Sequence, residues 1–171
     1  PLSRITMQDF VDRFRDRIPT KMKGREFLDR FGETGDPFDR IDPDAVYKIR
    51  SRTEHHVYEN TRVQEFVDLL AKASRSHERT QLLAAGALLG ASHWSYGQRC
   101  GMGSIETDLL VNLIKKGADG DAKDAHQDTD IYAAKVSARG CGGTVAVLME
   151  KNDTARHALE HALVEYARRT G

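Results

Sequence analysis

Apolar residues recur three or four positions apart near the start of the chain, which is the spacing of one helix face. They follow Thr6, a suitable N-cap, and stop before Pro19, which cannot continue a helix. The apolar face consists of Met7, Phe10, Val11, Phe14 and Ile18. The pattern predicts an amphipathic helix from Met7 to Ile18.

Shorter signals follow. The segment "REFLDRFG" predicts a helix that ends at Gly32, and the Gly, Pro and Asp content of residues 33–44 predicts a loop. Residues 45–52, "AVYKIRSR", alternate between apolar and polar positions, which predicts a strand.

Three helices are expected between residues 54 and 117. The first begins near Glu54, the second is rich in small residues that permit close packing, and the third begins at Ser104 and ends before Gly117. Their predicted inward positions are Val63, Phe66, Val67 and Leu70 in the first helix, Leu82, Leu83, Leu89 and Tyr96 in the second, and Ile105, Leu109, Leu110, Leu113 and Ile114 in the third.

The chain ends with strands expected at 131–138 and 144–149, and with a helix that starts near Asn152. The inward face of that helix is predicted to carry Ala155, Leu159, Ala162, Leu163 and Tyr166. Helices dominate and one strand pair follows them, so we predict an α+β fold in which a helix-rich layer packs on a small antiparallel sheet.

The length and the charge of the chain limit the classes of function that it can have. The 171 residues favour a single domain over 1–171, and equal numbers of basic and acidic residues, 26 of each, argue against nucleic acid or an anionic membrane as a partner. Two cysteines without metal-type spacing favour a reducing cytoplasm. No signal peptide or membrane span is expected. Because the chain opens on Pro1 and stops just after a helix, we expect it to be a piece of a longer protein.

"HALEH", residues 157–161, matches a zinc-peptidase pattern in which two histidines one turn apart hold the metal. Both histidines fall on the solvent side of the predicted last helix, and only Glu165 follows as a further carboxylate. We therefore interpret the motif as a surface helix and predict no metal site.

Two glycine-containing segments carry the remaining candidate chemistry. "CGMGS", residues 100–104, precedes a helix, so it fits either an anion-binding helix N-terminus or a tight turn between helices. "SARGCGG", residues 137–143, joins the two strands and fits either a hairpin turn or an anion-binding nest of amides beside Arg139. It lacks the lysine of a P-loop and does not precede a helix as a Rossmann glycine run does. Backbone logic leaves both choices open.

Several of these segments, in this order, resemble the C-terminal half of the GHMP sugar kinases, the galactokinase-like family, and above all its arabinokinase branch. They are "HHVYENTRVQEFVDLL", "LLGASHWSYGQRCGMGSIETDLLVNLI" and "IYAAKVSARGCGGTVAVL". The resemblance implies the GHMP C-terminal, ferredoxin-like arrangement. In the last motif, Ala138 and Arg139 replace glycines of the family pattern, and Cys141 stands where serine is usual.

The resemblance implies an ATP-dependent sugar 1-kinase acting on L-arabinose or galactose, with ATP and Mg²⁺ as cofactors of the complete enzyme. Its N-terminal ATP-loop domain, on the same polypeptide or a separate chain, is absent here, so we expect no catalytic residue in this chain, no tight cofactor binding and no activity of the chain alone. The implied phosphate-side residues are Ser137, Ala138, Arg139, Gly140, Cys141, Gly142 and Gly143, and the implied sugar-side residues are Gly101, Gly103, Ser104 and Asp108. The alternative is a non-catalytic module that senses a small molecule or binds a partner.

Overall fold

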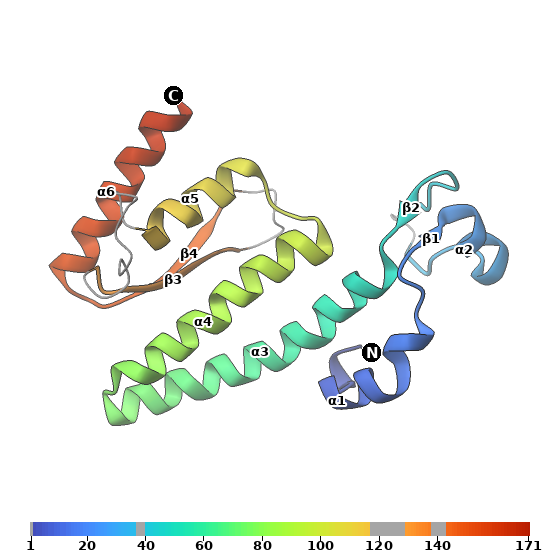
Figure 1. Cartoon of the computed structure of the whole chain (residues 1–171), viewed down its shortest axis with the longest axis horizontal. Coiled ribbons are helices and arrows are strands. Elements are labelled where there is room, and N and C mark those ends of the chain that lie inside the picture. The colour runs from blue at the N-terminus through green and yellow to red at the C-terminus, as the bar shows by residue number, and fades with distance from the viewer. Residues whose placement is uncertain (1, 37–39, 117–128, 138–142) are drawn as a thin grey trace. The chain divides into compact units, whose positions relative to one another are not determined.

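The computed structural model of the chain describes residues 2–36, 40–116, 129–137 and 143–171 (Figure 1). Helices dominate, and the strands form two antiparallel pairs, so the predicted α+β class is confirmed. The chain forms two compact units, Pro1–Thr61 and Arg62–Gly171. The expectation of one domain over 1–171 stays a prediction.

The N-terminal unit contains short elements and the start of one long helix. In chain order they are η1 (Leu2–Arg4), α1 (Met7–Asp9), the π-helical η2 (Phe10–Phe14), the 3₁₀ turn η3 (Arg15–Arg17), β1 (Met22–Lys23), α2 (Gly24–Phe31), β2 (Val46–Tyr47) and the first part of α3 (Ile49–Ser76). The predicted helix end at Gly32 is confirmed, with φ of 74° at that glycine.

The first predicted helix is present but irregular. Thr6 caps it as expected, because its Oγ1 accepts a hydrogen bond of 3.0 Å from the Asp9 amide. The chain then changes from α to π to 3₁₀ geometry before Ile18. These geometries differ in residues per turn, so one 3.6-residue stripe cannot stay on one face. Phe10 is fully buried, whereas Met7 and Val11 are exposed.

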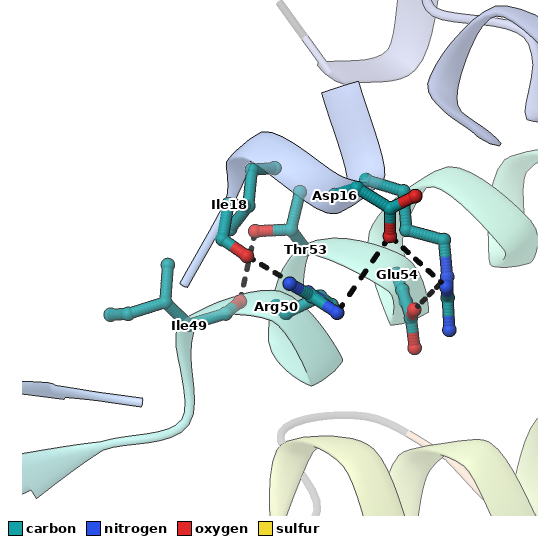
Figure 2. Close-up of polar contacts among 7 residues, drawn as sticks. Asp16, Ile18, Ile49, Arg50, Thr53 and Glu54 are labelled. Carbon is teal, nitrogen blue, oxygen red and sulfur yellow. Dashed lines mark hydrogen bonds and ion pairs between the residues drawn. The ribbon is translucent and has the colours of Figure 1, made fainter. Parts of the chain in front are cut away.

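The strand predicted at 45–52 is wrong beyond Tyr47. β2 pairs with β1 through two residue pairs only, Met22 with Tyr47 and Lys23 with Val46. Beyond Tyr47 the chain turns into helix α3 at Ile49, five residues before the expected start at Glu54. Figure 2 shows its first turn, in which Thr53 Oγ1 donates to the Ile49 carbonyl at 3.0 Å.

Charged contacts hold the start of α3 to the chain before Pro19 (Figure 2). The Nε atom of Arg50 donates to the Ile18 carbonyl at 2.8 Å, and Arg15 Nε donates to Glu54 Oε1 at 2.9 Å. Glu54 is a buried carboxylate, with 10% of its side chain exposed. The same unit has an open groove of about 630 Å³, lined by Asp16, Arg17, Ile18, Pro19, Met22, Phe27, Arg30, Phe31, Ile49 and Arg50.

The C-terminal unit contains the longer elements. After the rest of α3 come α4 (Arg79–Ser95), the π-helical turn η4 (Tyr96–Cys100), α5 (Ile105–Lys116), β3 (Ile131–Val136), β4 (Val145–Met149) and α6 (Asp153–Thr170). The expected helices and strands are present here, although α4 gives way to η4 at Tyr96, β3 ends at Val136, and the predicted strand end at 138 lies outside the described residues. Asn152 caps α6 by accepting a hydrogen bond of 2.8 Å from the Ala155 amide.

The core of this unit lies where α5, β3 and α6 meet. Its buried members are Val111, Leu113, Ile114, Ile131, Ala134, Val136, Ala155 and Ala162. The predicted inward positions are wrong for Val63, Val67, Leu83, Ile105 and Leu163, which are all exposed. Each helix buries only part of the apolar stripe, and Ile105 is 85% exposed because it opens α5 ahead of the turn that packs.

Helix α4 packs closely on β3 (Figure 1). The approach depends on Gly86, where an added Cβ would lie 2.6 Å from the Tyr132 carbonyl oxygen. The expectation that the small residues of this helix allow close packing is confirmed at that position. Among the described residues, no helix is long and apolar enough to cross a membrane.

Candidate functional site

The "CGMGS" segment forms the turn between η4 and α5. Gly101 and Gly103 have φ values of 68° and 100°, a region that favours glycine. Ser104 caps α5 as predicted: its Oγ accepts from the Thr107 amide at 3.2 Å, and its own amide donates to Thr107 Oγ1 at 3.0 Å. Backbone and capping needs therefore explain these residues, and their predicted role on the sugar side stays a prediction.

A second effect of the cap is electrostatic. The side chain of Ser104 hydrogen-bonds the Glu106 carboxylate and lowers the pKa of Glu106, with a smaller contribution from its backbone amide. The first turn of α5 therefore stabilises negative charge, as expected near the positive end of a helix dipole.

Asp108 is the fourth predicted sugar-side residue, and it lies in the first turn of α5 with 57% of its side chain exposed. Its Oδ1 atom is 3.4 Å from His93 Nε2. An added Cβ at Gly103 would lie 3.9 Å from the same oxygen. The structure thus brings the turn and this carboxylate together, and the carboxylate remains open to solvent.

The predicted phosphate-side segment begins at the end of β3. Ser137 donates its amide to the Thr144 carbonyl at 2.9 Å, which extends the β3–β4 ladder, and Gly143 has φ of 74°. Ala138, Arg139, Gly140, Cys141 and Gly142 lie outside the described residues. The segment joins two paired strands, as both readings of "SARGCGG" require, and a phosphate-side role stays a prediction.

Side chains of α4 and β3 connect these segments, and the sequence analysis did not assign them to the site. Lys135 Nζ donates to Ser92 Oγ at 2.5 Å, and the Val136 amide donates to His93 Nδ1 at 3.4 Å. Two successive residues of β3 are thus bound by two successive residues of α4. A polar pair in an apolar, small-residue helix, and a lysine within the strand "IYAAKV", were the available signals.

His93 occupies a partly buried position, with 15% of its side chain exposed. Burial is the main cause that lowers its pKa; Asp108 opposes this effect, while Lys115 and Lys135 add to it. The neutral imidazole is therefore favoured, and it can accept one hydrogen bond and donate another.

The "HALEH" histidines stand apart from this cluster. His157 and His161 are exposed on α6, so the predicted solvent-facing position is confirmed. Within the described ranges, no group of three or more His, Cys, Asp or Glu side chains is placed to hold a metal ion.

Comparison with known proteins adds one relationship. No protein-family model matches the chain. The L-arabinokinase of Arabidopsis thaliana is 34% identical over 147 residues, which cover 86% of this chain and 14% of that protein. The chain therefore spans about one seventh of the length of this curated relative. Identity at this level across most of the chain relates the protein to a sugar kinase.

Proposed function

We propose that the chain is the C-terminal part of an ATP-dependent sugar 1-kinase of the galactokinase-like GHMP type, with L-arabinose favoured over galactose. The observation that supports this proposal is the 34% identity to an L-arabinokinase over 86% of the chain. Its partner is an N-terminal domain that carries the ATP loop and the catalytic acid, on the same or a separate polypeptide. The proposed location is the cytoplasm, without nucleic-acid or membrane partners.

The proposed reaction transfers the γ-phosphoryl group of ATP to the anomeric hydroxyl of the sugar. Such transfers depend on positioning and on stabilising the charge of the phosphoryl oxygens, for which Mg²⁺ is the usual partner. By the family resemblance, we assign the ATP and Mg²⁺ contacts mainly to the N-terminal domain, with the 137–143 segment lying beside the phosphates.

On the sugar side, the exposed Asp108 carboxylate is suited to accept hydrogen bonds from sugar hydroxyls. Gly101 and Gly103 shape the turn beside it, and the polar groups of Ser104 are engaged in the cap of α5. The proposed contribution of this chain is thus to orient the sugar, while the N-terminal domain supplies the phosphoryl group.

A chimera tests the sugar-side role. Residues of this chain replace the matching 147-residue segment of the Arabidopsis enzyme, and L-arabinose phosphorylation is measured with Asp108→Asn and with Asp153→Asn. Asp153 is a matched control, because it is also an exposed aspartate in the first turn of a helix. We expect Asp108→Asn to raise KM for the sugar about 10-fold, with KM for ATP nearly unchanged, and Asp153→Asn to change neither. Equal effects of the two variants would contradict the assignment of Asp108.

The rival function is a non-catalytic module for small-molecule sensing or partner binding, which the replacement of two family glycines by Ala138 and Arg139 favours. Glycine at positions 138 and 139 of the chimera distinguishes the kinase from the non-catalytic module. If the loop is adapted for catalysis, glycine leaves activity equal or lower, whereas a decayed loop gains activity on restoration. The chain alone is expected to release no ADP in the presence of L-arabinose and ATP.

A further inference from the structure

We propose that His93 is a positioning residue that ties the end of β3 to the first turn of α5 through its neutral, Nε2-protonated tautomer. The proposal rests on the proposed function in one respect: the end of β3 is taken to face the phosphates, and the first turn of α5 to face the sugar. Its structural part rests on His93, its bonded neighbours and the strand edge that it covers.

The hydrogen-bond pattern of β3 shows why this histidine is needed. Ser137 donates to Thr144 across the hairpin, and the alternation of an antiparallel ladder turns the amide of the preceding Val136 to the opposite edge. α4 covers that edge, and Val136 is buried. A buried amide requires an acceptor, and His93 Nδ1 supplies it at 3.4 Å.

This bond determines the tautomer. A nitrogen that accepts from a backbone amide must carry its lone pair, so the ring proton of neutral His93 belongs on Nε2. Nε2 lies 3.4 Å from Asp108 Oδ1, which can accept that proton's hydrogen bond. One imidazole thus joins Val136 of β3 to Asp108 of α5, and Lys135 is fixed beside it by Ser92.

Protonation would break the arrangement, because a proton on Nδ1 would face the amide proton of Val136. The charged groups that bear on His93 are Asp108 and Lys115 from α5 and Lys135 from β3. The two lysines and burial disfavour the imidazolium, whereas Asp108 favours it. The link is therefore expected to persist at neutral pH and to open when the imidazole is protonated.

Three substitutions separate the hydrogen bond with Val136 from the contact with Asp108. In His93→Asn the side-chain oxygen can take the place of Nδ1 and accept from Val136, whereas in His93→Gln the amide nitrogen can take the place of Nε2 and donate to Asp108. His93→Ala removes the hydrogen bond and the contact together. His157→Ala, at an exposed histidine, is the control.

The test is nitrogen-15 NMR of the 171-residue chain, which reports the tautomer of His93 and the exchange rate of the Val136 amide. We expect the Nε2-protonated form, titration of His93 below the ordinary pKa of 6.5, and a Val136 amide shift with the same midpoint. Val136 exchange should rise at least about 10-fold in the Ala and Gln variants and stay within about 3-fold in the Asn and His157→Ala variants, as expected for loss or retention of one buried bond.

An Nδ1-protonated ring in the unsubstituted chain would overturn the proposal even if a variant fails to fold. The proposal would also be overturned if the Val136 amide shift did not change as His93 titrates, or if the Val136 amide stayed protected from exchange in His93→Ala. In the chimera, His93→Ala should lower kcat more than it raises KM, with partial rescue by Asn. An inactive chimera with the expected NMR result would refute the proposed function and leave the positioning role intact.

Discussion

The two units of the chain use different means to hold their elements. In Pro1–Thr61, two-residue strands and broken helical turns are joined by guanidinium contacts such as Arg15 with Glu54, and many apolar side chains line an open groove. In Arg62–Gly171, long helices and a hairpin with five residue pairs close over a continuous apolar core. The contrast shows that long regular elements build a shared core even though each buries only part of its apolar stripe, whereas short elements depend on individual contacts.

The same contrast explains where the candidate site lies. Asp108, Lys135 and Ser137 project from or follow α5 and β3, which contribute to the core of the C-terminal unit, and His93 projects from α4, which packs on β3. Rigid elements hold a few side chains in fixed geometry better than loops do. The longest-range polar contacts of the N-terminal unit, in comparison, are used to hold its own segments together.

Truncation of Phe10 should change stability the most, and it tests whether the two units are separate. Phe10 is fully buried and stacks edge-on against Tyr58 at a centroid distance of 6.1 Å. We expect Phe10→Ala to destabilise the N-terminal unit by about 3 kcal/mol, the usual cost of such a cavity. Hydrogen exchange read by mass spectrometry should show faster exchange in residues 1–61.

The matched variant is Val111→Ala, which truncates a buried side chain in the core of the C-terminal unit. Its cost should be about 2 kcal/mol, and the faster exchange should fall in residues 62–171. If both variants accelerated exchange equally throughout the chain, the two units would be one cooperative structure and the comparison would fail.

Gly86→Ala should be next in size. The added Cβ would meet a backbone oxygen, which cannot rotate away, so we expect a loss of about 2 kcal/mol measured by denaturant unfolding. Gly90→Ala is the control on the same helix, since its Cβ would meet only the flexible Lys115 side chain and the helix gains up to about 1 kcal/mol. A neutral Gly86→Ala would argue against the close packing of α4 on β3.

Tyr132 provides a smaller, pH-dependent effect. Burial, together with the hydrogen bond of its hydroxyl to Glu150, raises its pKa to about 12. The folded chain keeps this proton above pH 10 while the unfolded chain loses it, so stability falls as the pH rises from about 10 to about 12. In absorbance titration at high pH, Tyr132→Phe should lack the late phenolate signal, and identical curves would contradict this assignment.

The smallest effect should come from the exposed end of α6. Hydrogen bonds from Arg168 and Arg169 lower the pKa of Glu165 to about 2. The contribution is present above the ordinary pKa of 4.5 and is lost as the pH falls toward about 2. Carbon-13 NMR should show this carboxyl titrating last among the glutamates, with only local fraying of the helix. A midpoint near 4.5 would show that the arginines do not hold it.

Features that depend on neighbouring residues could be predicted from the sequence, whereas features that depend on distant partners could not. The caps at Thr6, Ser104 and Asn152, and the β3–β4 hairpin, depend on neighbouring residues and could be predicted. The strand at 45–52 could not be excluded, because its length depends on β1, a partner more than 20 residues away.

The residues of the candidate site also fall into those that the sequence identified and those that it missed. The Gly101–Ser104 turn and Asp108 were identified through motif resemblance, and the structure explains the turn by backbone and capping needs. His93 and Lys135 were missed as site members because each acts through a partner in another element, 43 positions distant in both of their hydrogen bonds. Such pairings are set by tertiary packing and leave only the weak signal of a polar residue in an apolar segment.

The most direct measurement of the central claim is L-arabinose-dependent ADP release by the chimera that carries this chain within the Arabidopsis enzyme. A C-terminal kinase domain should support activity within about 10-fold of the parent, because the chemistry depends on positioning that a related fold can provide. A chimera that folds and binds ATP, yet releases no more ADP with L-arabinose than without it, would contradict the claim.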